Sequence, residues 1–400
     1  MQDFLTSMLE LLMIAIVVAL LARRLRLPYS VGLVVAGTGL ALSPFHPGLA
    51  LTRSVIFDLI LPPLLFEAAI HIRWSALRQD ALPILTLAVP GTLLTALALT
   101  LAGYYGLGWP LQPALLFGVL IAATDPVAVI AMFKDNGVHG RLRLLVESES
   151  LLNDGVAAVA FALALAWVEA AGQASLPPAQ IAWLLAVMVG GGVIAGALCA
   201  GFALLVMRRA ADAVIEGALT IVLAYGSFLL AEQFHASGVL ATVTAGLCAG
   251  NLGLARDGRL SLQGREFTLA LWDFLAFIAN SFVFLLIGLA VAGIPFRELG
   301  YVHLGLIIAM VLLGRALAVY PLCALFRGSP RAVPPAFQHV LWWGGLRGAL
   351  ALALALALPV GLVLRNEVLI ATFAVVVFSV VFQGLTMPWL LRALRIIRAR

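Results

Sequence analysis

The stretch AATDPVAV, residues 122–129, places a hydroxyl group and a carboxylate directly before a proline within a long apolar run. Proline has no amide hydrogen, and its ring disrupts the bond to the carbonyl four residues earlier, here that of Ala122. In lipid, such an interruption is tolerated only inside protein or beside a watery cavity, where the freed carbonyls can bind cations. The stretch therefore predicts a broken membrane helix, with the break at Pro126 and with Thr124 and Asp125 beside it.

The composition of the whole chain supports a membrane setting. Of its 400 residues, 63% are hydrophobic and only 11% are charged, and the mean hydropathy is +1.11. A soluble fold needs about a quarter of its residues charged to cover its surface, so soluble enzymes, disordered proteins and fibrous proteins are excluded. Cys199, Cys248 and Cys323 lie in apolar stretches without metal or disulfide spacing and are interpreted as core residues.

Apolar segments long enough to cross a bilayer, which takes roughly 20 residues, recur along the chain. We place thirteen of them at residues 5–21, 29–42, 55–72, 82–101, 113–132, 144–168, 181–207, 213–231, 239–254, 268–291, 302–326, 337–358 and 368–391. The first segment carries Asp3 and Glu10 and lacks a small-residue cleavage site, so we expect a span rather than a signal peptide. The prediction is an all-α polytopic protein whose single transmembrane domain covers residues 1–400, with no separate soluble domain.

The basic residues test this segmentation, because short cytoplasmic loops are enriched in Lys and Arg. Of the 24 basic residues, one side of the predicted membrane holds Arg23, Arg24, Arg26, Arg73, Arg78, Lys134, Arg141, Arg143, Arg208, Arg209, Arg256, Arg259, Arg265, Arg327, Arg331, Arg392, Arg395, Arg398 and Arg400. The other side holds only Arg53, Arg297 and Arg365. We therefore expect a multi-pass protein of the cell (inner) membrane with the amino terminus outside and the carboxyl terminus in the cytoplasm.

A second polar stretch, ESLLNDG at residues 149–155, lies in the sixth predicted span. Ser150 and Asp154 are one helical turn apart and share a face, whereas Glu149 is rotated away from it. Ionised side chains inside a membrane are costly, so they persist when paired, solvated in a cavity or used in function. For any one of these acids, a structural ion pair is an equally good interpretation. Asp58, Glu67 and Asp273 also lie within predicted spans; pairing or solvation is the simpler interpretation for them, and lining an ion funnel is the alternative.

Thr124, Asp125, Ser150 and Asp154 offer only oxygen atoms as ligands. Oxygen ligands suit hard cations rather than zinc or copper. Burial favours the protonated form of a carboxyl group, so the same oxygens can hold either a proton or a metal ion. Competition between the two at one site would couple the movement of a cation to that of a proton.

A third stretch, WWGGLRGA at residues 342–349, lies in the twelfth predicted span. Paired glycines weaken a helix, although tight helix packing is the commoner role of glycine in membranes. We favour a helix break at Gly344 and Gly345, because spans five and twelve run in opposite directions and both carry an interruption. This is the pattern of inverted repeats with discontinuous helices. The repeats would cover approximately 4–170 and 213–391, with 179–207 as a linker helix.

Together the ATDPVAV, ESLLNDG and GGLRGA stretches, with LPPLLFE at residues 61–67, resemble the monovalent cation/proton antiporters of the NhaP and sodium/hydrogen exchanger type. The resemblance covers the whole predicted membrane domain. It implies the NhaA-like antiporter fold with crossing discontinuous helices, and a homodimer. It also implies that Asp154 is the central ion-binding and proton-exchanging carboxylate, and that Thr124, Asp125 and Ser150 complete the coordination of Na⁺.

The resemblance assigns supporting roles to the neighbouring residues. Asn153 stands where electrogenic relatives have an aspartate; its amide would bond to Asp125, and its lack of charge implies electroneutral, one-for-one exchange. Glu149 is expected to pair with Arg315 in the eleventh span. Arg347 is expected to steady the broken twelfth helix.

The leading hypothesis is thus a secondary active Na⁺/H⁺ antiporter that works by alternating access and serves pH homeostasis, with Li⁺ or K⁺ as possible substrates. A K⁺/H⁺ antiporter is the first alternative. A passive cation channel, with the oxygen cluster as a filter, is a weaker one. An enzyme is disfavoured because the sequence contains no nucleophile, cofactor or metal motif. We expect no cofactor and no nucleic acid partner, and we expect contact with monovalent cations, protons and membrane lipid.

Overall fold

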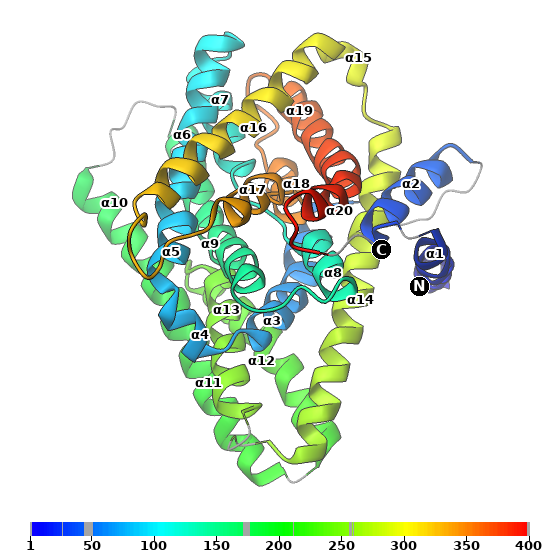
Figure 1. The fold of residues 1–400 in the computed structure, drawn as a ribbon, viewed down its shortest axis with the longest axis vertical. Coiled ribbons are helices and arrows are strands. Elements are labelled where there is room, and N and C mark those ends of the chain that lie inside the picture. Colours follow the sequence, from blue (N-terminus) through cyan, green and yellow to red (C-terminus); the bar gives the residue numbers. More distant parts are fainter. Residues whose placement is uncertain are drawn as a thin grey trace. The chain divides into compact units, whose positions relative to one another are not determined.

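The computed structural model describes residues 2–25, 27–43, 51–170, 177–210, 212–255, 258 and 260–397. Arg26, Arg256, Arg259, Arg398 and Arg400, which support the topology prediction, lie outside these residues. The described residues form helices and connecting turns, without a strand (Figure 1). The fold is therefore all-α, as predicted.

The α-helices are α1 (Gln2–Leu25), α2 (Tyr29–Ala41), α3 (Leu61–His71), α4 (Trp74–Gln79), α5 (Ala81–Thr86), α6 (Thr92–Leu101), α7 (Leu111–Leu120), α8 (Val127–Asp135), α9 (Arg141–Glu169), α10 (Pro178–Leu185), α11 (Gly191–Ala210), α12 (Ala213–Gln233), α13 (Gly238–Cys248), α14 (Leu262–Ala292), α15 (Phe296–Leu299), α16 (Tyr301–Ala324), α17 (Pro335–Trp343), α18 (Ala349–Leu356), α19 (Arg365–Phe378) and α20 (Gly384–Ala393). Six π-helical turns continue or join them: η1 (Val55–Ile60), η2 (Leu87–Gly91), η3 (Ala102–Gly106), η4 (Ala186–Gly190), η5 (Ala249–Gly253) and η6 (Ser379–Gln383). Pro90 lies inside η2, where the wider turn accommodates a residue that cannot donate a hydrogen bond.

Helices occupy each of the thirteen predicted segments, but they differ in continuity. Among the described residues, seven are long and apolar enough to cross a membrane: Ala81–Gly106, Arg141–Glu169, Ala179–Met207, Ala213–Gln233, Leu262–Ala292, Tyr301–Ala324 and Arg365–Ala393. Tyr29–Ala41, Leu111–Leu120 and Gly238–Gly253 are shorter apolar helices. The chain is therefore a multi-pass membrane protein, and the count of thirteen spans stays a prediction.

Two compact units divide the chain. The first comprises Met1–Ile56, Pro83–Asn153 and Asn280–Arg400, and the second comprises Phe57–Leu82 and Asp154–Ala279. Helices α9 and α14 each contribute residues to both units. Each unit also takes segments from both predicted repeats, and the division into repeats stays a prediction.

The first unit contains both interrupted helices. Helix α7 ends at Leu120 and α8 begins at Val127, directly after Pro126. Helix α17 ends before Gly344, and α18 begins at Ala349. Helix α18 packs against α7 and α19, which brings the second break beside the first. The helix breaks predicted from Pro126 and from Gly344 and Gly345 are thus present.

The second unit is built around α3, α11, α12 and α13, and α13 packs against the other three. The Phe66 ring of α3 contacts the Trp272 ring of α14, with ring centroids 4.4 Å apart. The Trp272 indole is fully buried, and its Nε1 donates a hydrogen bond of 2.8 Å to Thr220 Oγ1 of α12. This polar link gives the buried indole N–H a partner and fixes α14 against α3 and α12.

Candidate functional site

The two helix breaks meet at Asp125. Its backbone amide donates a hydrogen bond of 2.7 Å to the carbonyl of Leu346 in the other break. Its carboxylate accepts hydrogen bonds from the amide of Val127, at 2.9 Å, and from the amide of Ala349. Those amides open α8 and α18, and helix N-termini carry partial positive charge. One carboxylate therefore caps two half-helices.

The close approach of Asp125 to the second break depends on a missing side chain. A Cβ atom at Gly348 would overlap the Asp125 carboxylate. Glycine at this position lets the carboxylate reach the first amide of α18. The sequence pattern GGLRGA thus contributes a contact as well as a break.

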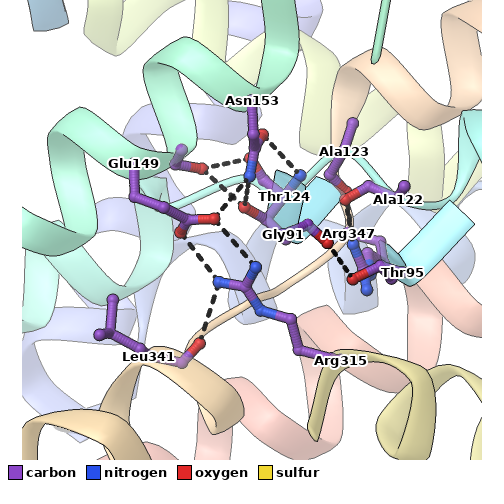
Figure 2. A network of polar contacts seen from close by, with 11 residues as sticks. Gly91, Thr95, Ala122, Ala123, Thr124, Glu149, Asn153, Arg315, Leu341 and Arg347 are labelled. Carbon is purple, nitrogen blue, oxygen red and sulfur yellow. Dashed lines mark hydrogen bonds and ion pairs between the residues drawn. The ribbon is translucent and has the colours of Figure 1, made fainter. Parts of the chain in front are cut away.

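Arg347 supplies the hydrogen bonds that the first break has lost. Its guanidinium is buried, and Nη1 donates to the carbonyls of Ala122, at 2.7 Å, and Ala123, at 2.9 Å (Figure 2). The Ala122 carbonyl is the one that Pro126 was predicted to leave without its helical partner. We expected Arg347 to steady the broken twelfth helix, and its side chain in addition serves the break between α7 and α8.

Ser379 holds the Arg347 backbone in turn. The Arg347 amide donates to Ser379 Oγ at 3.0 Å, and Ser379 Oγ lies 3.1 Å from the Arg347 carbonyl. Sequence analysis missed this serine. No distinctive signal marked it, because the thirteenth predicted span also contains the hydroxyls of Thr372 and Thr386.

A buried oxygen cluster lies beside the breaks. Thr124 Oγ1 and Ser150 Oγ are 3.0 Å apart, and Ser150 Oγ also donates to the Thr124 carbonyl. Both residues are 2% exposed. The two hydroxyls come from the extended segment before α8 and from α9, so the structure brings together two residues that sequence analysis had placed in one site.

Asn153 anchors this cluster. Its Nδ2 donates to Thr124 Oγ1 at 2.6 Å, and its Oδ1 accepts from the Thr124 amide at 3.2 Å (Figure 2). Asn153 Nδ2 also lies 3.1 Å from Glu149 Oε1, one turn earlier on α9. The expected bond from Asn153 to Asp125 is therefore wrong. The Asn153 amide binds Thr124 instead, the residue before Asp125. The Asp125 carboxylate is already bonded to the N-terminal amides of α8 and α18.

Glu149 and Arg315 form the ion pair that the resemblance implies. Two nearly parallel bonds join the guanidinium to the carboxylate, at 2.9 and 2.8 Å, and the side chains are only 3% and 4% exposed (Figure 2). Arg315 Nη2 also donates to the carbonyl of Leu341 at 3.2 Å, shortly before the second break. The pair thereby connects α9, α16 and α17. A pocket is lined by Thr124, Pro126, Val146, Glu149, Ser150, Arg315, Leu341 and Gly344.

Asp154 follows Asn153 on α9, and its side chain is half-buried. The helix is continuous from Arg141 to Glu169, so Asp154 stands one turn after Ser150 on the same face. It belongs to the second compact unit, whereas the other predicted site residues belong to the first. Within the first unit, the structure brings together Thr124, Asp125, Pro126, Glu149, Ser150, Asn153, Arg315, Gly344, Gly345 and Arg347.

Comparisons with known proteins show the family of the chain. Residues 12–393 match the family described as sodium/hydrogen exchanger, transmembrane. The chain is 38% identical over 382 residues to the Na(+)/H(+) antiporter ApNhaP of Aphanothece halophytica, covering 94% of this chain and 71% of that protein. It is 35% identical over 409 residues to the Na(+)/H(+) antiporter NhaH of Halobacillus dabanensis, covering 99% of each. The fold matches that of the sodium proton antiporter MjNhaP1 from Methanocaldococcus jannaschii at pH 8, with a TM-score of 0.74 at 20% identity and coverage of 98% and 99%. The chain thus belongs to the transmembrane sodium/hydrogen exchanger family.

Proposed function

We propose that this chain is a secondary active antiporter that exchanges Na⁺ for H⁺. The observation that carries the proposal is the buried pair of hydroxyls, Thr124 and Ser150, set where two broken helices meet and one helical turn from Asp154 on α9. Oxygen ligands of this kind suit a hard monovalent cation. The antiporter names of the relatives NhaH and ApNhaP support the same activity.

In this mechanism Asp154 is the residue that binds the proton and the cation in turn. The ionised carboxylate attracts Na⁺, and the hydroxyl and carbonyl oxygens of Thr124 and Ser150 replace part of its hydration shell. Protonation of Asp154 removes the charge that holds the cation and releases it. Because one carboxylate serves both ions, the site carries one or the other as it faces each side of the membrane.

Asp125 has a mixed role in the proposal. Its carboxylate fixes the amide ends of α8 and α18, which holds the Thr124 oxygens in place. Its negative charge adds to the attraction for Na⁺, so we keep it among the residues of the ion site. Arg347 and the Glu149–Arg315 pair position the site without contacting the ion.

Asn153 supports electroneutral exchange. Its amide is already used in hydrogen bonds to Thr124 and Glu149, and an amide does not carry a transported proton. With Asp154 as the exchanging acid, one Na⁺ moves for one H⁺. The same vesicles that report transport should then develop no membrane potential, which a voltage-sensitive dye can follow.

The wider setting is part of the same proposal. We infer that residues 1–400 form one transmembrane antiporter domain in the cell inner membrane, with inverted repeats at approximately 4–170 and 213–391. The amino terminus would lie outside and the carboxyl terminus in the cytoplasm. The protein would act as a homodimer in pH homeostasis without a cofactor.

Transport by the purified protein in liposomes tests the proposal. An imposed pH gradient should drive Na⁺ uptake against its concentration gradient, and Asp154→Asn should abolish this uptake because the exchangeable proton is lost. Glu169→Gln, which removes an exposed acid from the end of the same helix, is the matched control and should transport normally.

The outcomes separate the alternatives. Na⁺ flux that runs only downhill, with no proton movement, would show a channel. Uphill uptake of K⁺ in preference to Na⁺ would show a K⁺/H⁺ antiporter. Full exchange by a folded Asp154→Asn variant would remove Asp154 from the mechanism.

A further inference from the structure

Away from the breaks, the second unit holds a group of three metal-ligating side chains. Glu67 and His71 lie on α3, and Asp273 lies on α14. One ligand atom of each residue lies within 4.8 Å of the others. Two carboxylates and an imidazole form a mixed oxygen and nitrogen donor set, unlike the all-oxygen cluster around Thr124.

The imidazole of His71 is held in the manner of a metal ligand. His71 Nδ1 lies 2.8 Å from the backbone carbonyl of Glu67, to which it donates in one of its two neutral tautomers. That tautomer leaves a lone pair on Nε2. Histidines that bind metals commonly donate their second ring nitrogen to a backbone carbonyl in this way, because the bond fixes the tautomer and the ring. The Glu67 carboxylate lies 3.5 Å from Nδ1, the nitrogen that this backbone bond already uses, so Nε2 is the atom that would bind an ion.

The two helices that carry the group are fixed to each other and to their surroundings. Phe66 precedes Glu67 and packs on Trp272, the residue before Asp273. At the end of α3, Asn251 Nδ2 donates to the Ile72 carbonyl at 2.9 Å, and Asn251 Oδ1 accepts from the Trp74 amide at 2.7 Å. The three ligating side chains therefore project from a rigid frame, which a metal site requires.

Solvent can reach the group. The side chains of His71 and Glu67 are 28% and 19% exposed, and Asp273 is exposed. His71 also lines a cavity of about 710 Å³, whose other polar side chains are those of Arg73, Ser75, Asn251 and Arg265. Of the three ligating residues only His71 lines the cavity, which leaves room for water molecules beside the imidazole.

We propose that Glu67, His71 and Asp273 bind a divalent transition metal ion of the Zn²⁺ class. Three protein ligands plus water is a common zinc arrangement, and the two carboxylates balance the charge of the ion in a membrane setting. Zinc bonds of about 2.0–2.2 Å bring ligand atoms to about 3.4 Å from one another, so the side chains close inward on binding. The imidazole selects against Na⁺ and Mg²⁺, which prefer oxygen ligands. The site does not depend on the proposed ion exchange at Asp154.

Metal binding to the purified full-length protein tests the proposal. Titration with Zn²⁺ should show one site per chain, and His71→Ala and Asp273→Asn should each weaken binding by at least about tenfold. His303→Ala, which removes an exposed histidine of α16, is the matched control and should bind as the parent does. Co²⁺ in place of Zn²⁺ should give visible absorption bands that His71→Ala changes.

Thermal unfolding provides a second measurement of metal binding. Zn²⁺ should raise the thermal unfolding temperature of the parent and of Asp154→Asn, but not that of His71→Ala or the milder His71→Gln. Equal Zn²⁺ binding by the parent and both His71 variants would overturn the proposal. So would Mg²⁺ binding as tight as Zn²⁺ binding, or the absence of a Zn²⁺ site in the parent.

Discussion

Glu149 and Arg315 form an ion pair that is almost fully buried. Their side chains are 3% and 4% exposed, and two short hydrogen bonds join them. Removing two charges from water is costly, and the attraction between them repays the cost only while both are present. Replacing only one of the two residues should therefore lower the stability of the folded protein more than replacing both.

Glu149→Gln should destabilise the protein strongly, by about 3–5 kcal/mol, because Arg315 is left as a buried, uncompensated charge. Thermal unfolding in detergent, followed by circular dichroism or aggregation, measures the change. The double variant Glu149→Gln with Arg315→Met should recover most of the lost stability, since an apolar replacement removes the unpaired charge.

A second pair on α9 is the control. Arg143 and Glu147 are 3.3 Å apart, but their side chains are 20% and 12% exposed, so water screens them more. Glu147→Gln should cost less than about 1 kcal/mol. Glu149→Gln and Glu147→Gln variants of equal stability would contradict the argument from burial.

At this scale the sequence carried part of the answer. The resemblance to known antiporters implied that Glu149 pairs with Arg315, and the two side chains are joined. The contact between Asn153 and Thr124 joins residues from different elements, so helix periodicity contains no information about it. The expected partner, Asp125, is one residue away from the true one, and only the capping of α8 and α18 explains the difference.

At the scale of elements, Arg347 joins the two broken helices. It stands in the break before α18, and it donates to two carbonyls in the break after α7. Arg347→Met should leave the Ala122 and Ala123 carbonyls buried without a donor, at a cost of about 1–3 kcal/mol for each. Thermal stability should fall, and Na⁺/H⁺ exchange in liposomes should fall with it, because the Thr124 oxygens lose their support.

Arg141 provides the comparison for Arg347. It also donates to two backbone carbonyls, those of Ala332 and Arg331, at 2.7 and 2.8 Å, but it is half-buried and water can replace it. Arg141→Met should therefore lower stability less than Arg347→Met does. Normal stability and exchange in Arg347→Met would show that the breaks hold without the guanidinium.

The positions of the elements were predictable and their junctions were not. Long apolar runs mark helices because a membrane demands them, and Pro126 and the Gly344–Gly345 pair mark breaks through local backbone chemistry. The register between the breaks rests on the hydrogen bond from Asp125 to Leu346 and on the gap at Gly348. Neither a bond between backbone atoms nor the missing side chain of a glycine changes the sequence in a way that would identify the residue it contacts.

At the scale of the molecule, charge sorting predicts orientation. Basic loops stay on the cytoplasmic side because moving them across the bilayer is disfavoured during insertion. Labelling of single cysteines tests the orientation, in a background in which Cys199, Cys248 and Cys323 are replaced by serine. In Arg78→Cys, the new thiol should react with a membrane-impermeant thiol reagent only when the reagent is added on the cytoplasmic side. A cysteine in place of Arg297 should react only from outside. Labelling of both from one side would refute the predicted topology.

The double cap at Asp125 also makes the crossing a mechanical unit. One carboxylate holds the first turns of α8 and α18, so neither half-helix can shift along its axis without pulling the other or breaking a charged hydrogen bond. The pair should therefore travel as one stiff piece during any rearrangement. The crossing also depends on this single residue, because removing the charge of Asp125 would weaken the hydrogen bonds to both half-helices at once.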